Sequence, residues 1–253
     1  MDHTILSARD LNLYYGENHA LKNIMIDLPE RQITALIGPS GCGKSTFLRT
    51  INRMNDLIPG VKITGSLTYR GEEVYAPGRD VTDLRRHIGL ATQDVLLYSD
   101  TIEGNIAYGD GSIKINDVVK FARYSSASDF IAKMPEGYDT IVGERGVGLS
   151  GGQKQRISLA RALAIRPSIL ILDDTTSAVD METEKQIQHS LKELDFPCTK
   201  VIIAQRISTT RDADRIIVLR DGYIEESGTH EELLAKKGYY YELVKLQTGL
   251  DEL

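Results

Sequence analysis

The sequence predicts an α/β fold with a mostly parallel core sheet, an antiparallel β subdomain and an inserted α-helical subdomain. Three short segments share the nearly continuous apolar character of parallel strands that are covered on both faces: 33–38, 168–172 and 200–204. Segments flanking Arg70-Gly71 and Asp221-Gly222 indicate antiparallel hairpins near the two ends. From about 101 to 166 the apolar residues recur mainly at helical spacing. We expect this stretch to be a helical insertion.

Composition excludes several classes of protein. With 253 residues, 41% hydrophobic and 26% charged, the chain can form one large or two small globular domains. A net charge of -6 argues against nucleic-acid binding. Two cysteines, Cys42 and Cys198, suit a reducing compartment. The N-terminus lacks a signal-peptide pattern, and no stretch approaches the roughly 18 apolar residues of a membrane span. Any link to a membrane is therefore expected to run through a partner.

The first apolar strand leads into a glycine-rich turn and then a helix, expected from Lys44 to about Met54. The turn fits the pattern G-x-x-x-x-G-K-[ST] with Gly38, Pro39, Ser40, Gly41, Cys42, Gly43, Lys44, Ser45 and Thr46. Glycines allow a tight fold in which successive N–H groups point at phosphate oxygens, and the helix adds its positive end. A chance glycine turn is the alternative, but the strand before it and the helix after it favour a phosphate site.

Within this motif each reactive side chain has an expected role. Lys44 would place its ammonium against the β- and γ-phosphates, and Ser45 would offer a hydroxyl to Mg²⁺. Cys42 is interpreted as a small loop residue. The strand Ile169-Leu170-Ile171-Leu172 ends in Asp173, whose carboxylate could hold the Mg²⁺ hydration shell. Alone, this aspartate would merely end a strand; beside the phosphate motif we interpret it as a metal ligand.

The segment Leu149-Ser150-Gly151-Gly152-Gln153 predicts a capping box formed by Ser150 and Gln153 that opens a helix running to Pro167. The paired glycines allow backbone to approach a ligand closely. A capped helix without further function is the alternative. With the two preceding motifs, however, the chain resembles the ATP-binding cassette ATPases over essentially its whole length.

The resemblance implies a P-loop, RecA-like core and a head-to-tail pair of cassettes. ATP would lie between the phosphate loop of one cassette and Ser150, Gly151, Gly152 and Gln153 of the other. The implied organisation is a single domain over 1–253, with the core and antiparallel β subdomain in 1–93 and 167–253 and the helical subdomain in 94–166. Expected partners are ATP or ADP with Mg²⁺, a second cassette and transmembrane transporter subunits, with no nucleic acid. The expected location is cytoplasmic, on the inner face of the cell membrane.

The resemblance assigns further positions one by one. Tyr15 matches the aromatic residue that stacks on adenine, whereas Tyr14 is interpreted as an ordinary strand aromatic. Gln93 matches the glutamine that reaches Mg²⁺ and reports ATP to the transport subunit. The loop 177–180 matches the segment that crosses the dimer interface. Gly143-Glu144-Arg145-Gly146 resembles the exporter loop that contacts the membrane domain.

Two positions depart from the family pattern. Asp174 stands where the family has its catalytic glutamate, and Gln205 stands where it has the histidine that senses the γ-phosphate. Aspartate is one methylene shorter, and glutamine cannot become a cation. The combination resembles one half of a heterodimeric exporter. We therefore expect ATP to bind well and to be hydrolysed slowly to ADP and phosphate.

The two ends of the chain resemble different subfamilies. Residues 11–75 resemble the phosphate-import ATPase, and the chain from about His87 onward resembles an exporter ATPase. This suggests a chimera joined near residues 76–90; a natural importer subunit with an unusual second half is the alternative. An exporter cassette normally follows transmembrane helices on its own chain.

Two other functions remain as alternatives. One is a binding module in which ATP joins two cassettes and is not usefully cleaved, as Asp174 and Gln205 would favour. The other is a non-transport cassette acting in DNA repair or translation. Such proteins usually carry coiled-coil insertions or a second cassette in tandem, and the sequence shows neither.

Overall fold

The computed structural model describes residues 3–249 except 109, 144–145, 147 and 205. It divides into two compact units, the first formed by Met1–Arg85 with Thr199–Leu253 and the second by Arg86–Cys198. The predicted helical subdomain, 94–166, falls inside the second unit, and its exact boundaries stay a prediction.

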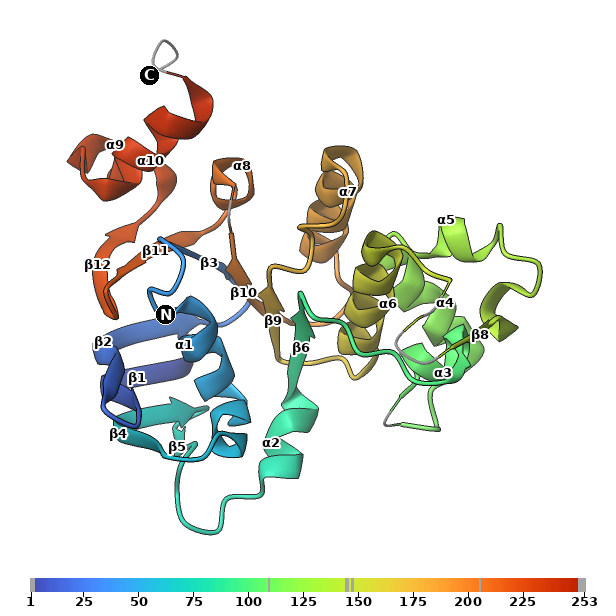
Figure 1. Ribbon diagram of the computed structural model, residues 1–253, viewed down its shortest axis with the longest axis horizontal. Helices are drawn as coiled ribbons and strands as arrows, with labels where there is room; N and C mark the ends of the chain where they lie inside the picture. The colour runs from blue at the N-terminus through green and yellow to red at the C-terminus, as the bar shows by residue number, and fades with distance from the viewer. Residues whose placement is uncertain (1–2, 109, 144–145, 147, 205, 250–253) are drawn as a thin grey trace. The chain divides into compact units, whose positions relative to one another are not determined.

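In the first unit, four strands form an antiparallel sheet in the order β2-β1-β4-β5 (Figure 1). These strands are β1 (Thr4–Tyr15), β2 (Asn18–Pro29), β4 (Val61–Tyr69) and β5 (Glu72–Glu73). Arg70 and Gly71 join β4 to β5 with φ angles of 51° and 81°, as a tight hairpin of two left-handed residues requires. The predicted antiparallel hairpin at this place is confirmed.

The parallel part of the first unit is centred on β3 (Ile33–Ile37), which lies between β10 (Thr199–Ile203) and β11 (Arg215–Arg220) and runs parallel to both. On the far side of β11, β12 (Tyr223–Gly228) pairs antiparallel. The predicted turn at Asp221-Gly222 is confirmed, with φ angles of 50° and 84°. Two parallel pairings and one antiparallel hairpin thus support β3, the strand that leads into the phosphate loop.

Helix α1 (Lys44–Ile51) follows that loop and is shorter than predicted. Asn52 caps its C-terminus, and Arg53 adopts a left-handed φ of 59°, so the helix cannot continue to Met54. A 3₁₀ turn, η1 (Met54–Leu57), comes next. Phe47, Leu48 and Ile51 are buried, as their helical spacing predicted.

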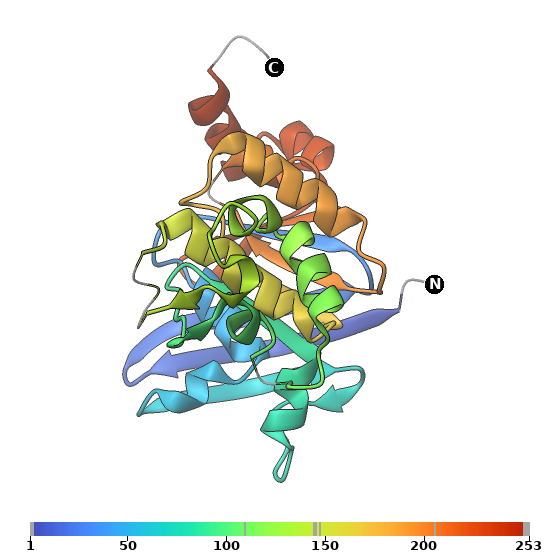
Figure 2. The same cartoon turned by 90° about the vertical axis from the view of Figure 1, so that its right-hand side faces the viewer.

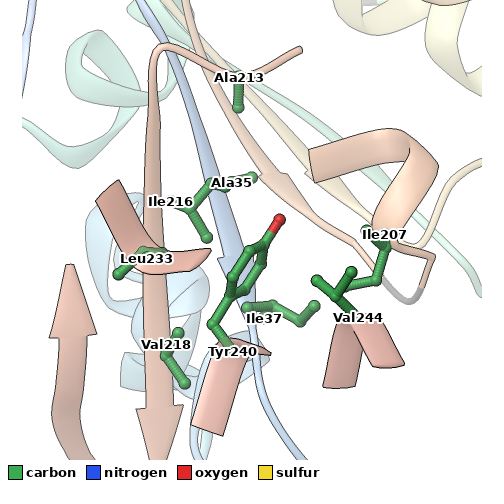
Figure 3. Close-up of a cluster of buried hydrophobic side chains, with 9 residues drawn as sticks. All are labelled: Ala35, Ile37, Ile207, Ala213, Ile216, Val218, Leu233, Tyr240 and Val244. Atoms are coloured by element: carbon green, nitrogen blue, oxygen red, sulfur yellow. The ribbon is translucent and has the colours of Figure 1, made fainter. Parts of the chain in front are cut away.

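The C-terminal part of the first unit contains three helices: α8 (Ile207–Thr210), α9 (His230–Lys236) and α10 (Tyr239–Thr248). They cover an apolar cluster shown in Figure 3, formed by Ala35, Ile37, Ile207, Ala213, Ile216, Val218, Leu233, Tyr240 and Val244. The Tyr240 ring lies in the middle of this cluster. Its hydroxyl is 3.1 Å from Thr210 Oγ1 and 2.8 Å from His230 Nδ1, so the buried oxygen has polar partners.

Helix α2 (Val81–His87) leads into the second unit, where β6 (Ile88–Thr92) pairs in parallel with β9 (Ile169–Asp173). Gly89 packs tightly against helix α6 (Gly151–Ala164), since an added Cβ would be 2.6 Å from the Ala162 carbonyl oxygen. A short antiparallel pair follows, β7 (Asp100–Thr101) with β8 (Ile141–Val142).

The remaining elements that the structure describes in the second unit are mostly helical, as predicted. They are α3 (Ile102–Ile106), α4 (Ile115–Tyr124), α5 (Ser128–Ile131), the 3₁₀ turn η2 (Gly137–Asp139), α6 (Gly151–Ala164) and α7 (Met181–Lys192). Helices α4 and α6 lie side by side in both Figure 1 and Figure 2. The prediction that α6 runs to Pro167 is wrong: it ends at Ala164, and Arg166 takes a left-handed φ of 47°.

Within the described part of the chain, no helix combines the length and the apolar character that a membrane span requires.

Candidate nucleotide site

The phosphate loop of the first unit depends on glycines that no other residue could replace without strain. Gly38, Gly41 and Gly43 have φ angles of 150°, 76° and 107°. A Cβ added at Gly38 would lie 2.0 Å from the Leu219 carbonyl oxygen, and one at Gly43 would lie 3.0 Å from that of Ala20. Packing against β2 and β11 therefore fixes the path of the loop.

Lys44 lies across this loop at the first position of α1. Its Nζ donates hydrogen bonds to the carbonyl oxygens of Gly38 and Pro39, both at 2.8 Å, and lies 3.6 Å from the buried Cys42 Sγ. Among the described residues, no side chain caps the N-terminus of α1. The ammonium group and the backbone N–H groups of the first turn thus occupy the same end of the helix, which attracts an anion.

The other residues of the motif differ in exposure. Ser40 is exposed, whereas Ser45 and Thr46 are half-buried within the first turn of α1. Cys42 is buried, and its N–H donates to the Pro39 carbonyl oxygen at 3.3 Å. This burial is consistent with Cys42 as a small loop residue.

Tyr15 ends β1 next to this loop. Its hydroxyl donates to Asn55 Oδ1 at 3.0 Å and lies 3.4 Å from Thr46 Oγ1, so the half-buried ring is attached to the α1 side of the unit. Tyr14, by contrast, stacks on His19 with ring centroids 4.0 Å apart. The two tyrosines thus have different environments, and the role expected for each stays a prediction.

The second unit brings two predicted metal ligands to one edge. Thr92 of β6 is in register with Asp173 of β9, so Gln93 and Asp174 both follow at the carboxyl ends of neighbouring parallel strands. Asp173 is buried and Gln93 is exposed. Asp174 has a φ of 53°, which aspartate tolerates better than most residues, and its carbonyl oxygen accepts from Ser177 Oγ at 3.1 Å.

The start of α6 confirms the predicted capping box. Ser150 Oγ accepts from Gln153 N at 3.2 Å, and Gln153 Oε1 accepts from Ser150 N at 2.8 Å. The paired glycines are in close contact with the loop 177–180. A Cβ at Gly152 would lie 2.7 Å from the Ala178 carbonyl oxygen.

Sequence reasoning assigned no role to Gln155. This buried glutamine donates through Nε2 to Ser177 Oγ at 3.2 Å and accepts from the Ala178 N–H at 3.1 Å. Gln155 therefore holds the loop after Asp174 against α6, the helix that begins within the signature segment (residues 149–153). A polar residue at a core-facing position of a helix was the only signal in the sequence.

A second unpredicted network surrounds Arg161. Its guanidinium donates to the Leu96 and Asn105 carbonyl oxygens at 2.8 and 2.7 Å and to Asn105 Oδ1 at 2.8 Å. Burial lowers the pKa of Arg161. The stacked rings of Tyr98 and Tyr108 lie 5.3 and 5.5 Å from its charged carbon, which places a delocalised cation beside two aromatic faces. This network fixes the segment that follows Gln93.

Some predicted positions lie outside the described residues, namely Gln205, Glu144 and Arg145. Of that predicted exporter loop, Gly146 N donates to the Gly143 carbonyl oxygen at 2.9 Å. Within the described part of the chain, no group of three or more His, Cys, Asp and Glu residues could hold a metal ion. The proposed Mg²⁺ ligands instead include serine and glutamine, which supply the oxygen atoms that this ion prefers.

A glycine-built phosphate loop at the start of a helix, with a buried carboxylate at the end of a parallel strand, defines a nucleotide-binding P-loop domain. The model of the family described as "ABC transporter" matches residues 21–177. The chain therefore belongs to the ABC transporter family, as an ATP-binding domain of α/β fold.

Known relatives match both units of the chain. It is 41% identical to an ATP-dependent lipid A-core flippase of Syntrophus aciditrophicus, over 98% of this chain and 40% of the flippase. It is 43% identical to a putative multidrug export ATP-binding/permease protein of Staphylococcus aureus, over 94% of this chain and 40% of that protein. A bacterial Atm1-family ABC exporter with ATP bound is similar with a TM-score of 0.89 and 35% identity, over 96% of this chain and 42% of that one. The chain thus spans about 40% of the length of these curated relatives.

Proposed function

We propose that the chain binds Mg-ATP, pairs head to tail with a second cassette and hydrolyses ATP slowly to ADP and phosphate to drive transport. The phosphate loop is the observation that carries this proposal. Its three positive-φ glycines lead into α1, and the Lys44 ammonium lies across the loop at the first turn of that helix. This arrangement is suited to a triphosphate. The relatives that carry export and flippase names support a role in export.

The oxygen ligands of this chain suit Mg²⁺. Ser45 at the start of α1 would offer its hydroxyl, and the buried Asp173 carboxylate would hold the hydration shell, with Gln93 beside it at the strand edge. When bound, the ion would neutralise charge on the phosphate oxygens. Lys44 would do the same from the loop side.

We propose that Asp174 orients the attacking water and accepts its proton, less effectively than a glutamate. Misplacement of a catalytic group by about 1 Å can cost about a hundredfold in rate. Gln205 would donate a hydrogen bond to the γ-phosphate without supplying a positive charge. Both substitutions would act on the ATP bound by this chain's own phosphate loop, which is why slow turnover is expected despite firm binding.

The signature residues Ser150, Gly151, Gly152 and Gln153 would serve ATP held by the opposing cassette. The close packing of Gly152 on Ala178 supports this role, because it brings the signature and the loop 177–180 onto one surface. Pairing would place the cassettes on transmembrane subunits at the inner face of the cell membrane. For this function we propose a single domain in which 1–93 and 167–253 form the core and the antiparallel β subdomain. Residues 94–166 form the helical subdomain.

The importer-like character of residues 11–75 and a junction near 76–90 stay predictions. The relatives carry export and flippase names and match 94–98% of this chain, so phosphate transport has no support from them. Identity compared separately for the two segments against importer and exporter cassettes, together with the genomic context, tests the chimera.

The experiment compares the full chain with Lys44→Ala. We expect ATP binding by calorimetry and slow, Lys44-dependent phosphate release. The double substitution Asp174→Glu with Gln205→His should raise turnover about tenfold or more, since it restores both family residues. Fast turnover in the original chain that the double substitution does not improve would contradict the proposed slow hydrolysis.

The alternative is an ATP-binding, nearly inactive half of a cassette pair. Asp174 and Gln205, which stand where the family has a glutamate and a histidine, favour it. Sedimentation with and without ATP, with phosphate release on the same sample, separates the two functions. ATP-dependent dimers that release no more phosphate than Lys44→Ala would establish the alternative.

A further inference from the structure

Asn55 is fully buried, and its side-chain amide hydrogen-bonds both to helix α1 and to Tyr15. Its Nδ2 donates to the Thr46 carbonyl oxygen at 3.0 Å and to Thr50 Oγ1 at 2.9 Å. Its Oδ1 accepts from the Tyr15 hydroxyl at 3.0 Å. A carbonyl oxygen can only accept, so the hydrogen bond to Thr46 fixes which end of the amide faces Tyr15.

The backbone that carries Asn55 is itself fixed. Arg53, with its left-handed φ of 59°, starts the 3₁₀ turn and forms an ion pair with Asp56 at 2.7 Å. Arg85 donates to the carbonyl oxygens of Asn52 and Arg53, both at 3.0 Å. The turn is therefore attached on both sides, and the amide has little freedom to follow a moving tyrosine.

Tyr15 is thus connected to the phosphate loop by a short series of hydrogen bonds. Its hydroxyl contacts Asn55, Asn55 contacts the Thr46 carbonyl, and Thr46 is the last residue of the loop motif. The same hydroxyl is 3.4 Å from Thr46 Oγ1. These hydrogen bonds set the position of the ring relative to the first turn of α1.

We propose that Asn55 is a positioning residue that holds the Tyr15 ring at a fixed distance from the phosphate loop, so that the ring contributes to binding the aromatic base of a nucleotide. This inference rests on the proposed nucleotide binding. A ring already fixed loses little conformational entropy when a base stacks on it, whereas a free ring would lose more. Asn55 should therefore affect the base and leave the phosphates alone.

The test measures affinity for Mg-ATP and for magnesium tripolyphosphate, which has no base, by calorimetry on the full chain. Tyr15→Phe keeps the ring and removes its hydroxyl, and Asn55→Leu removes the amide at similar volume. Each single variant should weaken ATP binding about three- to tenfold and leave tripolyphosphate unchanged. The double variant should be no weaker than the worse single variant, because both remove the same hydrogen bond.

Asn12→Leu is the matched control. Asn12 lies in β1, as Tyr15 does, and its side-chain amide makes hydrogen bonds with the Asp10 carbonyl oxygen, Asn23 and His19. None of these hydrogen bonds involves Tyr15. It should leave the ratio of the two affinities unchanged. Should Asn55→Leu fail to fold, Tyr15→Phe alone still decides the role of the hydroxyl.

Equal weakening of ATP and tripolyphosphate, an additive double variant, or unchanged ATP binding in Tyr15→Phe would each overturn the positioning role. If the unmodified chain binds ATP but Tyr15→Phe has no effect, only this inference fails. If the unmodified chain binds neither ligand, the proposed function fails and this inference fails with it.

Discussion

The phosphate loop of the first unit and the signature region of the second are both expected to meet ATP, but they are held in different ways. In the loop, glycines at Gly38 and Gly43 let backbone pass where any side chain would collide. At the start of α6, the side chains of Ser150, Gln153 and Gln155 bind backbone and hold it. The path of the loop depends on the absence of side chains at its glycines, whereas the start of α6 combines one such glycine, Gly152, with side chains that hold the backbone. Substitutions should therefore damage them by different mechanisms and by different amounts.

The largest effect is expected from Gly38→Ala. The new Cβ would lie 2.0 Å from the Leu219 carbonyl oxygen, and backbone cannot easily move away. We expect a loss of about 3 kcal/mol or more in unfolding free energy and no measurable ATP binding. Denaturant unfolding and calorimetry measure both.

Gly41→Ala is the control for that experiment. Gly41 has a φ of 76°, but a Cβ there meets nothing within 4 Å. Backbone strain alone should then cost about 1–2 kcal/mol. If the two variants lose the same stability, the close contact with β11 does not matter, and the distinction drawn for the loop is wrong.

The second prediction concerns Gln155→Leu in the signature region. The change leaves the Ala178 N–H and the Ser177 hydroxyl without their described amide partner, which should cost about 1–3 kcal/mol. Hydrogen exchange at the Ala178 amide should accelerate. Gln186→Leu, at an exposed position of α7, should stay within about 0.5 kcal/mol of the original chain. Unchanged exchange at Ala178 would show that Gln155 does not hold the loop.

A third, smaller effect compares two capping boxes of the same design. Ser150 with Gln153 starts α6, and Thr229 with Glu232 starts α9 in the other unit. Ser150→Ala and Thr229→Ala should each lower the unfolding free energy by about 1 kcal/mol. Only Ser150→Ala should also weaken ATP-dependent pairing in sedimentation. If both variants pair normally, the Ser150 hydroxyl serves the helix and nothing more.

Local sequence patterns predicted those parts of the molecule that local chemistry determines. The turns at Arg70-Gly71 and Asp221-Gly222, the capping box at Ser150 and the apolar strand before Asp173 depend on neighbours a few residues away. The predicted end of α6 at Pro167 is wrong, because Ile165 caps the helix and Arg166 turns the chain away with a left-handed φ of 47°.

The supporting amides could not be predicted in the same way. Gln155 is 22 residues from its partner Ser177 in the sequence, and Asn55 is 40 residues from its partner Tyr15. A buried amide is useful only when tertiary contacts satisfy its donors and acceptor, and its own residue type does not identify those contacts. The motifs of the candidate site were therefore predictable from the sequence, whereas the hydrogen bonds of the buried amides that hold these motifs in place were not.

Stability should respond to pH through a buried group that titrates and not through a buried amide, which leads to the smallest predicted effect. The Gln155 and Asn105 amides of the second unit do not titrate. In the first unit, His230 Nδ1 is 2.8 Å from the Tyr240 hydroxyl above the apolar cluster of Figure 3. Burial is the main cause that lowers the His230 pKa; Glu231 opposes this and Arg211 adds to it.

Because the pKa of His230 is lower in the folded chain, the unfolded chain binds more protons once the pH falls below its ordinary value of about 6.5. The contribution of His230 to stability is thus retained above that pH and lost as the pH falls toward the folded pKa. Unfolding free energy measured between about pH 7.5 and 5.5 should decline less in His230→Asn than in the original chain. His189→Asn, at an exposed position of α7, should keep the full decline. If His230→Asn declines as steeply, the buried histidine is not the source, and the contrast between this titrating group and a buried amide fails.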